Sequence, residues 1–92
     1  MIIPPVVKIL GQEYKIEFLG DKKKRNFIGR CFPNANIIQL EETLCKDKMG
    51  EVYLHEVLHA IDENLELGMK HKSINRLAIA LYQFLKDNDY IK

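Results

Sequence analysis

Residues 51–65 have the sequence EVYLHEVLHAIDENL, a stretch without proline or glycine whose key side chains recur at helical spacing. This pattern predicts an α-helix with one buried face. The helix is expected to begin near Asp47, with Asp47 or Thr43 as the N-cap, and to stop at Gly68. Gly50 weakens the first turn and leaves the start open.

A second helix is predicted towards the end of the chain. Its apolar residues form one stripe at positions i, i+3, i+4, i+7 and i+11, namely Ile74, Leu77, Ala78, Leu81 and Leu85. Such a stripe is typical of a helix that packs one face against a core. Ser73 lies at the start of this helix or just inside it.

The residues before the first helix alternate in the manner of β-strands. A β-hairpin is expected around Gly11-Gln12, because apolar residues alternate on both sides of this glycine-containing pair. Three or four strands are predicted, over residues 6–10, 13–18, 27–32 and 37–40. Their links are too short for crossovers, which favours an antiparallel meander. The expected fold class is therefore α+β, with a small antiparallel sheet followed by two helices.

Length and composition exclude several classes of protein. The chain has 92 residues, a formal net charge of +1, 47% hydrophobic residues and 29% charged residues. We expect one domain over residues 1–92, with neither nucleic acid nor a membrane as its main partner. The start of the chain lacks the basic segment of a secretory signal, and two cysteines cannot form a disulfide framework. These features favour a cytoplasmic protein with buried, reduced thiols.

The first helix carries the pattern H-E-x-x-H at His55-Glu56-Val57-Leu58-His59. On an α-helix, residues four apart differ by about 40° in azimuth and about 6 Å in rise, so the two imidazoles can converge on one cation. Neutral imidazole suits Zn²⁺, and Glu56 can reach water at the metal without being a ligand. The alternative is a helix with two satisfied histidines and a surface glutamate. Apolar flanking residues favour the metal, because buried polar groups are costly without a partner.

A catalytic zinc site takes a third protein ligand and keeps one position open. One straight helix cannot easily place three ligands around an ion, so this ligand is expected from another segment. His71 is the favoured candidate, because a turn at residues 67–69 would bring it back over the first helix. Glu66 and Glu63 are the next candidates, and a solvated His71 is the competing interpretation. Asp62 is a candidate acceptor for the outer N–H of a ligating histidine.

Residues 55–62 and 74–88 resemble the small phage- and prophage-type zincin metallopeptidases, which are related in pattern to the ImmA/IrrE group. The hairpin near residues 9–16 and the stretch of residues 29–40 also resemble the usual layout of these proteins. The resemblance implies a zincin-like core, in which a small sheet packs on the H-E-x-x-H helix and zinc lies in a cleft beside an edge strand.

The resemblance also implies roles for individual residues. It implies that His55 and His59 are zinc ligands and that Glu56 is the general base. Members of the group tend to supply an acidic ligand at the start of the last helix, where this chain has His71-Lys72. ImmA-type members cut a repressor of their own mobile element, which makes a repressor a candidate substrate by analogy of fold.

The hypothesis from the sequence is a zinc-dependent endopeptidase that acts on a protein or peptide. His55, His59 and His71 would bind Zn²⁺, and Glu56 would be the catalytic base. The alternative is a non-catalytic, metal-stabilised binding or regulatory module on the same fold. If residues 37–40 lie at the sheet edge, an extended substrate could add to them, and otherwise they are an ordinary core strand.

Overall fold

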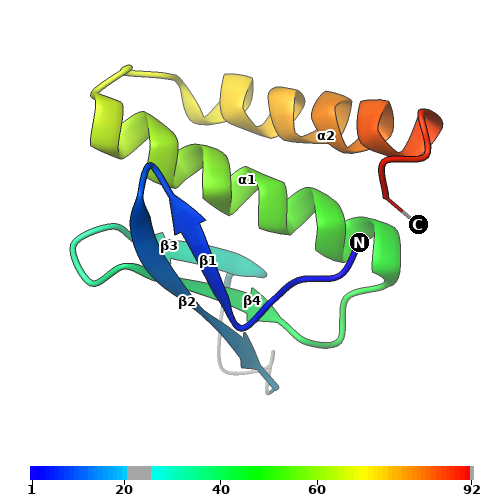
Figure 1. Cartoon of the computed structure of the whole chain (residues 1–92), viewed down its shortest axis with the longest axis horizontal. Helices are drawn as coiled ribbons and strands as arrows, with labels where there is room; N and C mark the ends of the chain where they lie inside the picture. Colours follow the sequence, from blue (N-terminus) through cyan, green and yellow to red (C-terminus); the bar gives the residue numbers. More distant parts are fainter. Residues whose placement is uncertain (21–25, 92) are drawn as a thin grey trace.

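The computed structural model describes residues 1–20 and 26–91, which form four strands followed by two helices. The strands are β1 (Val6–Ile9), β2 (Gln12–Leu19), β3 (Gly29–Phe32) and β4 (Ile37–Glu41), and the helices are α1 (Lys46–Leu65) and α2 (His71–Asp87). Figure 1 shows α1 lying across the sheet and α2 lying along α1. The predicted α+β class, with a four-stranded sheet before two helices, is confirmed.

The sheet is mixed rather than wholly antiparallel. Its strand order is β1-β2-β4-β3, in which β2 and β4 are parallel and the two outer pairs are antiparallel. In the expected meander, each strand would run in the direction that it has here. The prediction was therefore wrong only about which strands are neighbours. Nine residues link Leu19 to Gly29 in the sequence, which is long enough to pass over one strand position of about 5 Å. Residues 21–25 have the basic sequence DKKKR and lie outside the described residues.

This strand order places β4 inside the sheet and β3 at its edge. Residues 37–40 therefore form a core strand, and the suggestion that an extended substrate adds to them is wrong. Ile38 and Leu40 of β4 are fully buried, as expected for a strand with neighbours on both sides. The free edge beside α1 belongs to β3.

The hairpin between β1 and β2 turns one residue earlier than predicted. Ile9 pairs directly with Gln12, so the two turn residues are Leu10 and Gly11. Both have positive φ, 51° and 79°, which is the signature of a type I′ turn. Leu10 is an unusual residue for this conformation, which explains why the sequence pattern gave the wrong register for the turn.

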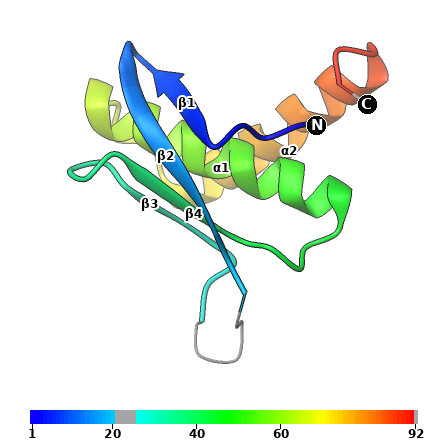
Figure 2. The same cartoon turned by 60° about the horizontal axis from the view of Figure 1, so that its bottom comes forward.

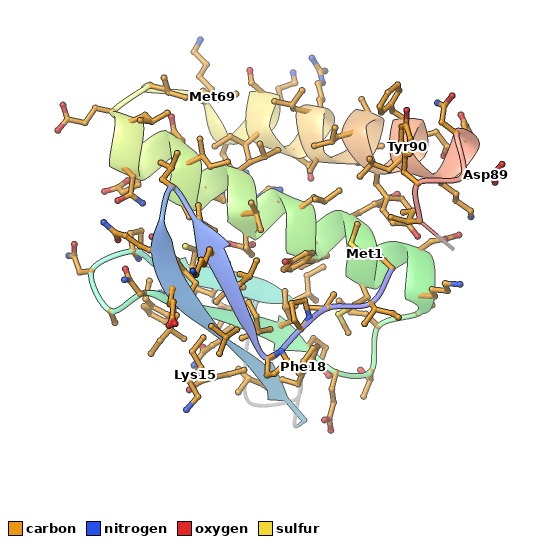
Figure 3. The ribbon with its side chains drawn as sticks, viewed as in Figure 1. Met1, Lys15, Phe18, Met69, Asp89 and Tyr90 are labelled. Atoms are coloured by element: carbon orange, nitrogen blue, oxygen red, sulfur yellow. The ribbon has the colours of Figure 1, made fainter. Side chains whose placement is uncertain are left out.

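The main core lies between the sheet and α1. Both helices lie on the same side of the sheet (Figure 2), and Lys15 of β2 projects away from them (Figure 3). The Asn64 side-chain amide of α1 donates hydrogen bonds to the buried Tyr14 hydroxyl and to the Ala60 carbonyl. The buried residues of this core are Ile9, Tyr14, Ile16, Ile38, Leu40, Val52, Tyr53 and Ala60.

The second helix packs on α1 with a narrower stripe than the sequence predicts. Ile74, Ala78 and Tyr82 are buried, whereas Leu77 of the predicted stripe remains 45% exposed. The ring of Tyr82 lies where a side chain on Gly50 would be, so glycine at this position allows the two helices to approach closely. None of the helices in the described part of the chain is long and apolar enough to cross a membrane.

The start of α1 also differs from the prediction. The N-cap is Cys45, which makes no side-chain capping bond, and Asp47 lies within the first turn. Thr43 instead donates a hydrogen bond of 2.7 Å from its hydroxyl to the buried carboxylate of Glu41. Cys45 is exposed and Cys31 is half-buried, so the expectation of two buried thiols is wrong for Cys45.

Candidate metal centre

Three histidine rings meet where α1 faces the start of α2. His55 and His59 lie one turn apart on α1, and His71 is the first residue of α2. The Nε2 atom of His55 lies 3.0 Å from that of His59 and 3.2 Å from that of His71. All three candidate ligand atoms lie within 4.8 Å of one another. The structure thus brings together the three histidines that the sequence singled out.

The connection between the helices explains how His71 reaches this place. Glu66 adopts the left-handed conformation that ends α1, with φ of 53°. The Asp62 carboxylate then accepts a hydrogen bond of 2.9 Å from the backbone N–H of Met69, which fixes the path of the returning chain. Figure 3 shows Met69 on this connection, at the opposite end of the helix pair from Asp89. The hydrogen bond found for Asp62 therefore serves the turn and is not made to a histidine.

The arrangement of the three rings suits coordination of a metal ion better than hydrogen bonding among the rings. In a tetrahedral shell with Zn–N distances of about 2.0–2.1 Å, the ligand atoms lie about 3.3–3.4 Å apart. The two spacings from His55, 3.0 Å and 3.2 Å, are close to this value. Nε2 of an imidazole carries either one hydrogen or one lone pair, so that of His55 cannot form a full hydrogen bond with both neighbours. A cation satisfies all three lone pairs at once. The His55, His59 and His71 group could therefore hold a metal ion.

Burial favours the neutral, metal-binding form of the His55 and His59 imidazoles. Burial, followed by the nearby His59 and His71 rings, lowers the pKa of His55 to about 4, and a hydrogen bond to Asn75 partly opposes this shift. Burial also lowers the pKa of His59, with His71 acting in the same direction. Neutral imidazole has the free lone pair that a metal ligand needs.

Glu56 is a buried carboxyl group beside the histidine cluster. It is 6% exposed, and the structure gives its carboxylate no hydrogen-bond partner among the described residues. Burial raises the pKa of Glu56 to about 7. A carboxylate buried without a partner costs free energy, and such groups are concentrated at functional sites.

The backbone of β3 lies directly against Glu56. A Cβ atom added to Gly29 would lie 3.0 Å from the Oε2 atom of Glu56 and 2.5 Å from the Cγ1 atom of Val52. Glycine is therefore required for this close approach. It places the free edge strand next to the carboxylate, with no side chain between them.

Two cavities meet at Glu56 and His71. One, of about 370 Å³, extends past His55 between the start of β3 and the two helices. The other, of about 340 Å³, extends past His59. Glu56 lines both cavities and therefore lies at their junction.

The other candidate ligands lie outside the histidine cluster. Glu63 is exposed and lines the second cavity, and Glu66 is exposed at the end of α1. Neither belongs to the metal-ligand group found among the described residues. That His71 acts as the third ligand, and that Glu56 is the base, remain predictions.

The sequence did not identify two contributors to the site. Asn75 contacts His55 from α2, and its position four residues after His71 on the same helix face was the available signal. Gly29 had no comparable signal, because its importance depends on how closely β3 approaches α1.

Comparison with known proteins assigns no relative to this chain. No family model, no curated protein and no solved structure matches it. The likeness to zincin-type peptidases thus depends on the chain's own features. These are the three-histidine group and Glu56 on α1, an arrangement consistent with an H-E-x-x-H metal site.

Proposed function

We propose that this protein is a zinc-dependent peptidase, in which His55, His59 and His71 hold the metal and Glu56 is the general base. One observation carries the proposal: a carboxyl group buried without a partner lies beside three imidazoles whose ligand atoms converge. Burying such a carboxyl group destabilises the folded protein and serves no structural purpose, whereas a catalytic base needs this placement.

The composition of the cluster favours a catalytic site over a structural one. Structural zinc sites fill four positions with protein groups, and catalytic sites use three and leave one open. The described residues supply three. When bound, zinc supplies Lewis-acid chemistry and makes water acidic enough to lose a proton near neutral pH.

The residues of the chain would divide the remaining work. Glu56, in its carboxylate form, takes a proton from the attacking water and later delivers it to the departing amine. The free edge of β3 offers backbone groups to an extended chain, and Gly29 lets that chain lie close to Glu56. This favours a protein or peptide in extended conformation as the substrate. The resemblance adds a repressor of a mobile element as one candidate.

The proposal is tested by measuring bound zinc and peptide cleavage on the same protein samples. We expect one equivalent of zinc by elemental analysis and cleavage of an unfolded protein such as casein. Glu56→Gln should retain the zinc and lower the cleavage rate by about 10²- to 10⁴-fold. His59→Ala should lose the zinc.

Glu63→Gln is the matched control, because Glu63 lies on the same helix and lines the second cavity but is exposed. It should retain both zinc and cleavage. If the zinc-loaded protein cleaves casein and a mixed peptide library no faster than Glu56→Gln does, the peptidase proposal is wrong. The metal-stabilised binding module then becomes the better interpretation.

A further inference from the structure

The cavity beside His55 has an apolar wall. Its volume is about 370 Å³, in the lower part of the range for small-molecule sites. Four apolar side chains line it, from the segment before β3, from α1 and from α2: Phe27, Ile28, Val52 and Ile79. His55 and Glu56 line the same cavity, so a group bound there lies next to the proposed reaction centre.

The cavity beside His59 has a different character. Arg30, Cys31 and Glu63 contribute to its lining. The two cavities share Gly29, Glu56 and His71, so they adjoin at the histidine cluster, with His55 lining the first and His59 the second. A chain crossing the cluster would therefore meet an apolar wall on one side and a more polar surface on the other.

Ile79 is an apolar residue that lies away from the face of α2 that packs against α1. It follows Ile74 by five residues, which places it about 140° around the helix from that buried position. It shares the polar side of α2 with Asn75, Gln83 and Lys86, and it remains 43% exposed. Its side chain contributes little to the core but lines the cavity next to His55.

The charges at this cavity do not favour a charged occupant. Lys48 and Glu51 line it from the first turns of α1, one residue of each sign and three positions apart. Their fields partly cancel inside the cavity. Among the apolar side chains, a charged group would lose hydration without a dedicated counter-ion.

We propose that this cavity is a specificity pocket that receives a large apolar side chain, such as that of leucine or phenylalanine, from the substrate residue next to the cleaved bond. Val52 of α1 and Ile79 of α2 both line it, and Ile79 is the residue that sets the preference. This inference rests on the proposed peptidase function and names the class of substrate.

The experiment measures binding of two zinc-directed probes to the zinc-loaded protein by titration calorimetry. The probes are acetohydroxamic acid, which has no large side chain, and 4-methylpentanohydroxamic acid, which carries a branched apolar chain. We expect the larger probe to bind the wild-type protein at least about tenfold more tightly. Ile79→Asp should abolish this preference and leave the affinity for acetohydroxamic acid unchanged, whereas Ile79→Leu should retain the preference.

Leu77→Asp is the matched control, since Leu77 is 45% exposed on the same helix but does not line the cavity. It should retain the preference of the wild-type protein. Equal binding of both probes, or a preference that survives in Ile79→Asp, would overturn the pocket and leave the peptidase proposal standing. If the protein binds zinc but neither probe, the open coordination position is absent, and both proposals fail.

Discussion

At the scale of single residues, the molecule places unusual demands at a few positions. Leu10 has a positive φ, Gly29 lies against a buried carboxylate, and Glu56 is buried without a partner. Positive φ disfavours a leucine, and burial disfavours an unpaired carboxylate. The Glu56 position has a proposed catalytic reason, whereas the turn at Leu10 has none in the structure.

The turn residue gives a direct prediction about stability. Replacing Leu10 with Asn creates the Asn-Gly pair that type I′ turns prefer, and Leu10 is 53% exposed, so little packing is lost. We expect the free energy of unfolding to rise by about 0.5–1 kcal/mol, measured by urea denaturation. Leu67→Asn is the control, because Leu67 is similarly exposed but does not have a positive φ. An equal effect of both substitutions would show that the turn is not strained.

At the scale of elements, the contact between α1 and α2 determines whether the third histidine reaches the other two. Gly50 lets the Tyr82 ring approach α1, and the Tyr82 hydroxyl donates a hydrogen bond of 2.8 Å to Asp47. Lys86 donates two more hydrogen bonds, each of 3.0 Å, to the same carboxylate. This end of the helix pair is thus tied by polar groups, and the other end by the turn that leads to His71.

The tight helix contact predicts an effect opposite to that of helix propensity. In an open helix, Gly50→Ala would stabilise the protein by about 1 kcal/mol. Here the added methyl group overlaps the Tyr82 ring, and overpacking of this kind costs about 1–3 kcal/mol, so we expect a net loss of stability. In a Tyr82→Val background the overlap is gone, and the same substitution should become neutral or stabilising. A double-mutant cycle by urea denaturation measures this difference.

The hydrogen-bonded group of Asp47, Tyr82 and Lys86, here called the Asp47 cluster, predicts that stability depends on pH. The hydrogen bond from Lys86, followed by that from Tyr82, lowers the pKa of Asp47 below its ordinary value of 3.8. A carboxyl group with a lowered pKa stabilises the folded state above the unfolded pKa, and this contribution is lost as the pH falls through the folded pKa. Asp47→Asn should therefore destabilise the protein at pH 7 and progressively less below about pH 3.8. Thermal unfolding across this range measures the gap, and Glu13→Gln, at an exposed strand position, should show a smaller one.

Sequence patterns predicted the elements better than they predicted the contacts between them. The strand segments, both helices and the convergence of His55 and His59 follow from local periodicity. Local periodicity does not reveal which strands lie beside β4, because every strand has the same direction in a meander as in the observed order. Gly50 misled the prediction of the helix start, since its benefit comes from Tyr82, which lies 32 residues later. Gly29 and Ile79 likewise gain their meaning only from segments that fold against them.

At the scale of the whole molecule, a metal would join the two helices far from the Asp47 cluster. His71 comes from α2, and the other two histidines come from α1. Zinc bound to the folded state alone would stabilise it, by about 2.7 kcal/mol when free zinc is 100-fold above its dissociation constant. Calorimetric unfolding with added zinc and after dialysis against EDTA should show this difference.

Replacing His71 tests whether the stabilisation by zinc depends on this histidine. His71 is exposed, so His71→Ala should change the stability of the metal-free protein by no more than about 0.5 kcal/mol. It should nevertheless remove most of the stabilisation by zinc. Lys72→Ala, at the adjacent exposed position, should respond to zinc as the wild-type protein does. An undiminished zinc response in His71→Ala would exclude His71 as a ligand.

The position of β4 between β2 and β3 has a consequence for synthesis on the ribosome. Until Glu41 has emerged, the nascent chain contains only the β1–β2 ribbon as a native pairing, and a lone two-stranded ribbon is marginally stable in water. The inner edge of β2 stays unpaired during this interval, which exposes a template for association with other chains. Translation must therefore deliver more than 40 residues before the sheet can assemble, and α1 follows almost at once to cover it.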